Sequence, residues 1–183
     1  HYRPNPSWMS ENCEDIVDTS GRLGEIGVKL AQAMKRYPQF FDDESLEDAC
    51  PAFPGMLPEK KLKIWIWVWT VMADQESGCD PDKPHPTHAR IRNRYGVREY
   101  RRINPKPGWG LFAAEYHQAH RDFRGPMCRG NIRSSTVQVN CAVDTMAKQL
   151  SEDGSFNSSN SYFGPVRRGE IQRKLRGYRP CRE

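Results

Sequence analysis

The first long apolar pattern of the chain has a helical period. Its apolar residues recur at spacings of three and four, which places them on one face of a helix. They are Leu23, Ile26, Leu30, Met34 and Tyr37. We expect this helix to start near Ser20, with Thr19 or Ser20 as its N-cap, and to stop before Pro38.

The most apolar stretch of the chain, from Lys60 to Gly78, admits two interpretations. Trp65, Trp67 and Trp69 alternate with other residues, as side chains do along one face of a strand. The stretch is nevertheless longer than an ordinary strand and contains no turn signal. Trp65, Trp69, Met72 and Glu76 also fall at positions i, i+4, i+7 and i+11, so we predict a buried helix that ends at Gly78.

Two more helices and a long irregular segment are expected downstream. Prolines and arginines fill the segment from Pro81 to Gly108, where we predict a loop. One further helix is predicted from Phe112 to Phe123, and another around Val139 to Leu150 with Ser134 or Ser135 as its cap. The fold class is therefore mainly α, and the length suits a single domain over residues 1–183.

Cysteine usage indicates an oxidising compartment. The chain holds six cysteines, an even number compatible with three disulfides: Cys13, Cys50, Cys79, Cys128, Cys141 and Cys181. None of them stands at the short spacing of a zinc knuckle, so we favour disulfides over metal binding. Their pairing stays open. No apolar run is long enough to cross a bilayer, and the polar residues 1–7 do not follow a signal-peptide pattern, which favours a mature, exported form.

The net charge of +5 is modest, but six arginines crowd into thirteen residues. They are Arg90, Arg92, Arg94, Arg98, Arg101 and Arg102. An anionic polymer is a plausible partner for such a cluster, and a solvated surface is the alternative. Because the chain shows no nucleic-acid-binding motif and the cysteines favour disulfides, we expect a cell-wall polymer and no nucleic acid.

Glu76 is the candidate for acid catalysis. It is expected at the C-terminal end of a helix whose same face carries Trp69 and Met72. Burial beside apolar groups raises the pKa of a carboxyl group, and the negative end of the helix dipole acts in the same direction. A glutamic acid that stays protonated near neutral pH can donate a proton to a leaving glycosidic oxygen.

The sequence after Glu76 resembles lytic transglycosylases and goose-type lysozymes. Glu76-Ser77, a loop and then Gly110-Leu111-Phe112 are similar to the Glu-Ser … Gly-Leu-Met/Phe-Gln pattern of that family, and Tyr162-Phe163-Gly164-Pro165 is similar to its later Tyr-Asn-Ala-Gly-Pro motif. The resemblance covers residues 60–165. It implies a lysozyme-like domain with a helical extension over 1–59, a basic tail over 166–183 and disulfides tying both.

The resemblance also implies an activity and a site. Glu76 would be the general acid in cleavage of the β-1,4 glycosidic bonds of bacterial peptidoglycan, either as a lysozyme or as a lytic transglycosylase that forms 1,6-anhydro products. Ser77 would support the acid. The residues expected to contact substrate are Trp109, Gly110, Leu111, Phe112 and Tyr162. No cofactor is implied, and we expect a monomeric protein that is secreted or periplasmic.

The sequence departs from the family pattern and leaves the second carboxylate open. Ala113 stands where the family has glutamine, and Tyr162 lies two rather than three residues before its glycine. Glu115 falls where goose-type lysozymes carry an aspartate, so it is the first candidate for positioning water, with Asp80 and Asp82 behind it. Asp74 is disfavoured because residues i and i+2 of a helix do not face each other.

A more distant resemblance concerns the substrate. The chain is faintly similar to lysozymes of predatory bacteria that act on de-N-acetylated peptidoglycan. The sugars of such strands carry ammonium groups, with which a carboxylate could pair. The sequence leaves acetylated and de-N-acetylated strands open as substrates.

Other functions compete with this interpretation. Two His-x-x-His pairs, His85 with His88 and His117 with His120, would suit a metal-dependent hydrolase, but no carboxylate completes a known signature. His1 would suit copper only in a β-sandwich oxygenase, and this chain is expected to be helical. A non-catalytic wall-binding protein is the third possibility, with tryptophan rings as sugar-stacking faces.

Overall fold

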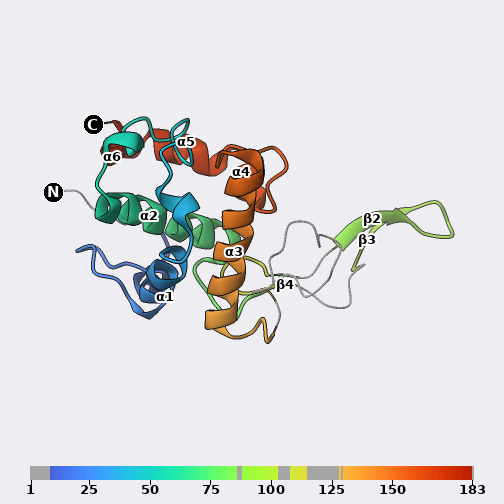
Figure 1. Cartoon of the computed structure of the whole chain (residues 1–183). Helices are drawn as coiled ribbons and strands as arrows, with labels where there is room; N and C mark the ends of the chain where they lie inside the picture. Colours follow the sequence, from blue (N-terminus) through green and yellow to red (C-terminus); the bar gives the residue numbers. More distant parts are fainter. Residues whose placement is uncertain (1–8, 86–87, 103–107, 115–127, 129, 183) are drawn as a thin grey trace.

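The computed structural model of the chain describes residues 9–85, 88–102, 108–114, 128 and 130–182. Within these ranges the protein is mainly helical, as predicted (Figure 1). Its α-helices are α1 (Glu25–Met34), α2 (Pro58–Ser77), α3 (Ser135–Asp153), α4 (Gly164–Arg167), α5 (Glu170–Arg176) and α6 (Arg179–Arg182). Three 3-10 helices precede α2: η1 (Glu11–Asp15), η2 (Pro38–Phe41) and η3 (Phe53–Gly55).

Helix α2 forms the centre of the molecule: α1, η2 and α5 contact it, and α3 packs against α1 (Figure 1). The prediction of a buried helix is confirmed, since Trp65, Trp67 and Trp69 are each less than 5% exposed. The Trp65 indole donates a hydrogen bond to the Phe40 carbonyl oxygen at 2.7 Å, so one of these rings also satisfies a buried polar group. A helix with apolar residues all around it must be covered on all sides, and α2 is covered in this way from Ile64 to Ala73.

Helix α1 forms where the apolar period predicts it, but it begins later than expected. Its N-cap is Gly24 rather than Thr19 or Ser20. The Ser20 hydroxyl instead donates to the Asp18 carboxylate at 2.6 Å within a local turn. A Cβ on Gly24 would lie 2.3 Å from the Asp15 carbonyl oxygen, so close backbone packing against η1 determines where α1 starts.

The segment predicted as a loop contains strands. Strands β2 (His88–Arg92) and β3 (Arg98–Arg102) form an antiparallel hairpin, and β1 (Pro84–His85) pairs with β4 (Gly108–Trp109). Asn93 builds the hairpin turn, because its side-chain oxygen accepts hydrogen bonds from the Tyr95 and Val97 backbone N–H groups at 2.9 and 3.1 Å. Gly96 completes the turn at a φ of +73°.

The helix predicted from Phe112 does not begin there. Residues 110–113 form a turn, and the Trp109 and Ala114 backbones pair across it through hydrogen bonds of 2.9 and 3.0 Å. Gly110 and Ala113 have φ angles of +78° and +53°, which a right-handed helix excludes. The rest of that predicted helix lies outside the described residues.

Three disulfides are present, which confirms that prediction. They are Cys13–Cys79, Cys50–Cys181 and Cys128–Cys141. The basic segment after residue 165 is helical, and Ile171, Leu175 and Cys181 are fully buried in the same apolar core as α2. The first and last described segments are thus tied to the core, one through Cys13 and the other through Cys181.

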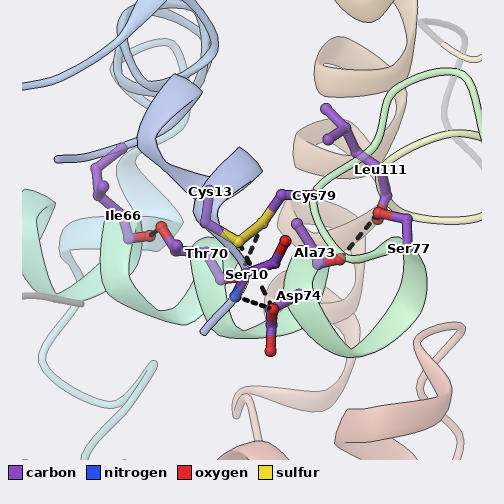
Figure 2. The surroundings of a disulfide bond; sticks show 9 residues. All are labelled: Ser10, Cys13, Ile66, Thr70, Ala73, Asp74, Ser77, Cys79 and Leu111. Atoms are coloured by element: carbon purple, nitrogen blue, oxygen red, sulfur yellow. Dashed lines mark hydrogen bonds between the residues drawn. A yellow bond between two sulfur atoms is a disulfide. The ribbon is translucent and has the colours of Figure 1, made fainter. Parts of the chain in front are cut away.

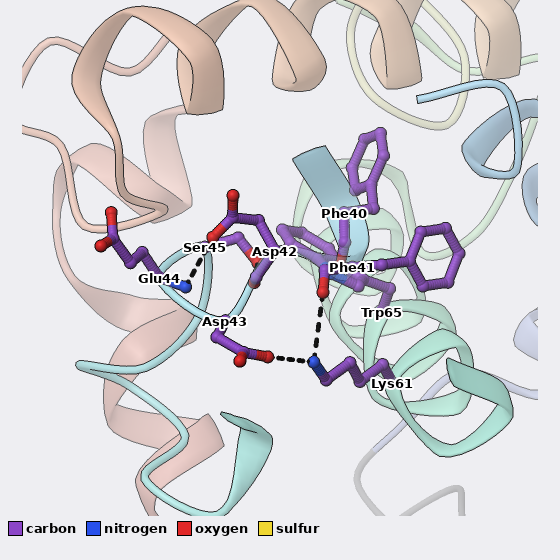
Figure 3. A network of polar contacts seen from close by, with 8 residues as sticks. All are labelled: Phe40, Phe41, Asp42, Asp43, Glu44, Ser45, Lys61 and Trp65. Atoms are coloured by element: carbon purple, nitrogen blue, oxygen red, sulfur yellow. Dashed lines mark hydrogen bonds and ion pairs between the residues drawn. The ribbon is translucent and has the colours of Figure 1, made fainter. Parts of the chain in front are cut away.

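A buried lysine joins α2 to the segment that follows η2. The Lys61 ammonium donates to the Phe41 carbonyl oxygen at 3.1 Å and pairs with the Asp43 carboxylate (Figure 3). Its charge also lies 5.0 Å from the centre of the Phe53 ring.

None of the helices in the described part of the chain combines the length and apolar character that crossing a membrane requires.

Candidate active site

Glu76 lies on the last turn of α2, and the residues around it determine how the helix ends. Gly78 adopts the left-handed conformation, with a φ of +61°, and stops the helix two residues later. The neighbouring Asp74 carboxylate accepts a hydrogen bond from the Ser10 backbone N–H at 2.8 Å, beside the Cys13–Cys79 disulfide (Figure 2). Asp74 thus holds the N-terminal segment against α2.

Glu76 borders a cavity of about 460 Å³ between the 110–113 turn and the segment that leads into α4. The cavity combines aromatic rings, hydroxyl and amide groups, and two guanidinium groups. Besides Glu76, its lining residues are Phe112, Ala113, Ser159, Asn160, Ser161, Tyr162, Phe163, Gly164, Arg167 and Arg168. Apolar surface with a few convergent polar groups is typical of a small-ligand site.

The aromatic core of α2 holds two walls of this cavity in place. The fully buried Trp69 ring packs edge-on against Phe112 and against Phe163, with ring centres 5.2 and 5.7 Å apart. Trp69 and Glu76 are seven residues apart on the helix and therefore share a face. The sequence predicted that Glu76 and Trp69 share a face of this helix.

A hydrogen bond joins the two segments that form the cavity. The Tyr162 hydroxyl donates to the Ala113 carbonyl oxygen at 3.2 Å. Ala113 is one of two described non-glycine residues with a positive φ. The contact ties Tyr162, and with it the segment that leads into α4, to the 110–113 turn.

Burial raises the pKa of the Glu76 carboxyl group, and nearby charges modify this effect. Desolvation is the largest contribution. His85, Arg168 and Arg167 act in the opposite direction because positive charge favours the carboxylate, whereas Glu170 adds to the rise. Glu76 is thus a carboxyl group biased toward its neutral, proton-donating form.

The two arginines at the cavity are held by different partners. Arg167 donates to the Ser161 carbonyl oxygen at 2.8 Å, and Arg168 pairs with Glu170 at 2.6 Å. A Cβ on Gly164 would lie 2.8 Å from an Arg168 guanidinium nitrogen, so this glycine leaves room for the arginine.

Ser77 and His85 anchor the 110–113 turn through hydrogen bonds to its backbone carbonyl groups. The Ser77 hydroxyl lies 2.9 Å from the Ala73 carbonyl oxygen and 3.1 Å from that of Leu111 (Figure 2). His85 Nε2 donates to the Gly110 carbonyl oxygen at 2.8 Å. Ser77 therefore ties the acid's helix to the turn and does not line the cavity itself.

Gln138 of α3 is a fully buried polar residue that sequence reasoning missed. Its side-chain oxygen accepts from the Leu111 N–H at 3.0 Å, and its amide nitrogen donates to the Pro81 and Ile132 carbonyl oxygens at 2.8 and 2.9 Å. A Cβ on Gly110 would lie 2.1 Å from Gln138. Gly110 is therefore required both for its φ and for this close approach.

The structure brings together only some of the predicted site residues. Glu76, Phe112 and Tyr162 meet at the cavity, whereas Leu111 is fully buried in the core. Trp109 does not line the cavity, and the Arg133 guanidinium covers its ring at 4.4 Å. Arg167, Arg168 and residues 159–161 were not predicted, because nothing in their local sequence places them beside Glu76.

The candidate second carboxylates do not form a pair with Glu76 among the described residues. Glu115 lies outside those residues. The Asp80 carboxylate accepts from the Asp82 N–H at 2.9 Å and so stabilises a turn. Glu170, which sequence reasoning did not single out, is the carboxylate whose charge acts on Glu76, and Arg168 neutralises it.

The described residues offer little for a metal ion. The one grouping found within the described ranges is Cys13, Asp74 and Cys79, and its two cysteines form a disulfide rather than thiolates. His85 bonds to Gly110, and the side chains of His88, His117 and His120 lie outside the described residues.

Comparison with protein-family models, with curated proteins and with solved structures found no match.

Proposed function

We propose that this protein is a glycoside hydrolase that cleaves the β-1,4 bonds of bacterial peptidoglycan, with Glu76 as the general acid. The observation that carries the proposal is a half-buried glutamate with a raised pKa at the wall of a cavity of about 460 Å³. Tyr162 offers an aromatic ring to a sugar, Phe112 adds apolar surface to the wall, and the exposed Ser159 and Asn160 supply hydrogen-bonding groups. The likeness of Glu76-Ser77 and Gly110-Leu111-Phe112 to the lysozyme pattern gives the substrate class.

The proposed mechanism begins with the neutral Glu76. It donates its proton to the glycosidic oxygen as the bond to the anomeric carbon breaks, and the sugar ring develops positive charge. The resulting carboxylate then accepts a proton from the group that attacks this carbon. An attacking water gives a reducing end, as in a lysozyme, whereas the sugar's own 6-hydroxyl gives a 1,6-anhydro end, as in a lytic transglycosylase.

The proposed site of action is outside the cytoplasm. Three disulfides within one chain of this size are typical of secreted or periplasmic proteins. Peptidoglycan lies in that compartment, so the proposed substrate and the redox chemistry of the chain agree. We propose that the protein acts there as a monomer and without a cofactor.

Digestion of purified peptidoglycan tests the proposal. Native and chemically de-N-acetylated wall are incubated with the parent protein and with Glu76→Gln, and the products are read by mass spectrometry. We expect cleavage by the parent and a loss of about 10²–10⁴-fold in Glu76→Gln. Glu59→Gln is the matched control, because this exposed glutamate lies on the first turn of the same helix.

Each outcome of the digestion has a defined meaning. Reducing ends indicate a lysozyme, anhydro ends a transglycosylase, and cleavage of the de-N-acetylated sample alone indicates recognition of the free amine. If Glu76→Gln cleaves as fast as Glu59→Gln, Glu76 is not the acid. Binding of both wall samples without cleavage would favour a non-catalytic wall-binding protein.

A further inference from the structure

The excess positive charge of the whole chain lies in one hairpin. Residues 88–102, which form β2, β3 and their turn, contain six arginines and one acid, Glu99. The full chain has 28 lysines and arginines and 23 acids, so the rest of the chain holds 22 of each and is balanced. The net charge of +5 is therefore the charge of the hairpin.

The strand register gathers most of these arginines at positions of one face. Directly opposed residues of an antiparallel pair belong to the same face, and the side alternates along each strand. The pairs Arg90↔Tyr100, Arg92↔Arg98 and His88↔Arg102 fall on one face of the hairpin. The other face has the pairs Ala89↔Arg101 and Ile91↔Glu99. Four of the six arginines thus share a face with Tyr100 and His88.

The opposed arginines of this face do not stabilise the hairpin. Like charges directly opposite each other, such as Arg92 and Arg98, destabilise a strand pair. Both of these side chains are exposed, and so are Arg94 and Tyr95 at the turn, where the guanidinium lies 4.9 Å from the ring centre. The turn is held by the backbone contacts of Asn93, which do not depend on the arginines.

The hairpin also projects away from the helical body (Figure 1). Its exposed turn residues Tyr95 and Val97 are 73% and 58% accessible. A long ligand can therefore lie along the hairpin without displacing any part of the core. The candidate cavity at Glu76 is formed by other segments, so the two sites are separate.

We infer that the arginine face of the β2–β3 hairpin binds a polyphosphodiester of the bacterial cell wall. The four arginine positions are spread along both strands, so a ligand with repeated anions can pair with more of them than one small anion can. The planar guanidinium fork matches phosphate oxygens with two parallel hydrogen bonds. A wall polymer suits this face better than nucleic acid because the three disulfides indicate an extracytoplasmic protein.

Salt-dependent binding of the oxidised, full-length protein to poly(glycerol phosphate) tests the inference. We expect affinity to fall with rising salt, as counterions are released. Removing two charges in Arg92→Gln/Arg98→Gln should weaken binding at about 0.15 M salt and lower the slope of log affinity against log salt by about two. The matched control is Lys35→Gln/Arg176→Gln, which removes two exposed charges from the helical body and should bind like the parent.

Competing ligands and a catalytic variant make the result specific. Single-stranded DNA and poly(glutamic acid), at the same concentration of anionic groups, should bind more weakly than poly(glycerol phosphate). Equal loss in both double variants, stronger binding of DNA, or equal binding of polyglutamate would each overturn the inference. Glu76→Gln should bind poly(glycerol phosphate) like the parent, so failure of the proposed catalysis leaves this test intact.

Discussion

The surroundings of Glu76 shift the pKa of its carboxyl group in opposite directions. Burial favours the neutral acid, while His85 and two arginines favour the carboxylate. The balance leaves the pKa above its ordinary value, so the acid form persists to a higher pH than in an exposed glutamate. Activity that depends on this proton should fall as pH rises through the pKa of Glu76.

The same raised pKa predicts how stability depends on pH. A carboxyl group whose pKa is higher in the folded than in the unfolded protein stabilises the fold at low pH and loses this contribution as pH rises through the folded pKa. Glu76→Gln does not titrate and keeps a neutral group of similar shape. We expect its thermal midpoint to match the parent near about pH 4 and to exceed it near about pH 8. A difference that is the same at both pH values would contradict this.

Gly110 offers a test of the turn beside the acid. Alanine at this position must adopt a φ of +78° and also displace Gln138. The left-handed conformation costs about 1–2 kcal/mol and overpacking about 1–3 kcal/mol, so Gly110→Ala should destabilise by roughly 2–5 kcal/mol in urea unfolding.

Gly154→Ala separates the two contributions to the Gly110 result. Gly154 has a φ of +67°, and no atom lies within 4 Å of the position that an alanine Cβ would take. Its substitution should therefore cost only the conformational part, about 1–2 kcal/mol. Equal losses in the two variants would mean that Gln138 moves aside without cost.

At the scale of elements, periodicity predicted the helices better than their boundaries. The long apolar run and Gly78 were sufficient to predict α2 and its end. The predicted start of α1 was wrong, because the helix begins where Gly24 packs against η1. That is a contact between two segments, which periodicity does not show. The hairpin was missed because arginines occupy strand positions that usually hold β-branched or aromatic residues, although Asn93 and Gly96 gave a turn signal.

The residues of the candidate site were likewise predicted only in part. Helical spacing placed Glu76 on the same face of α2 as Trp69, and the structure brings Phe112 and Tyr162 to the cavity that Glu76 borders. Arg167 and Arg168 could not be predicted there, because the short helices α4 and α5 bring them back to the end of α2 only through tertiary packing.

The join between α2 and the η2 segment can be tested through its buried lysine. Lys61→Ala removes the donor to the Phe41 carbonyl oxygen as well as the pair with Asp43, and should cost roughly 2–3 kcal/mol. Asp43→Asn should cost at most about 1 kcal/mol, because this carboxylate is 63% exposed and water replaces much of the interaction. Chemical denaturation of the two variants should give this order, and the reverse order would show that the charge pair dominates.

For the whole molecule, the disulfides constrain segments of very different length. Cys50 and Cys181 are 131 residues apart, whereas Cys128 and Cys141 are 13 apart. A longer loop loses more entropy on closure, so replacing the first pair by alanine should cost about 5 kcal/mol and replacing the second about 3 kcal/mol. Calorimetry of the two double variants measures this, and a larger loss for the shorter loop would contradict the entropic explanation.

The contact of Trp69 with Phe112 and Phe163 has a kinetic consequence. A ring at the centre of the core also supports two walls of the cavity, so the cavity cannot open widely while the core remains packed. Heat inactivation should therefore proceed at the rate of global unfolding, without an earlier, partly inactivated stage. A protein built in this way would stay functional until the moment it unfolds.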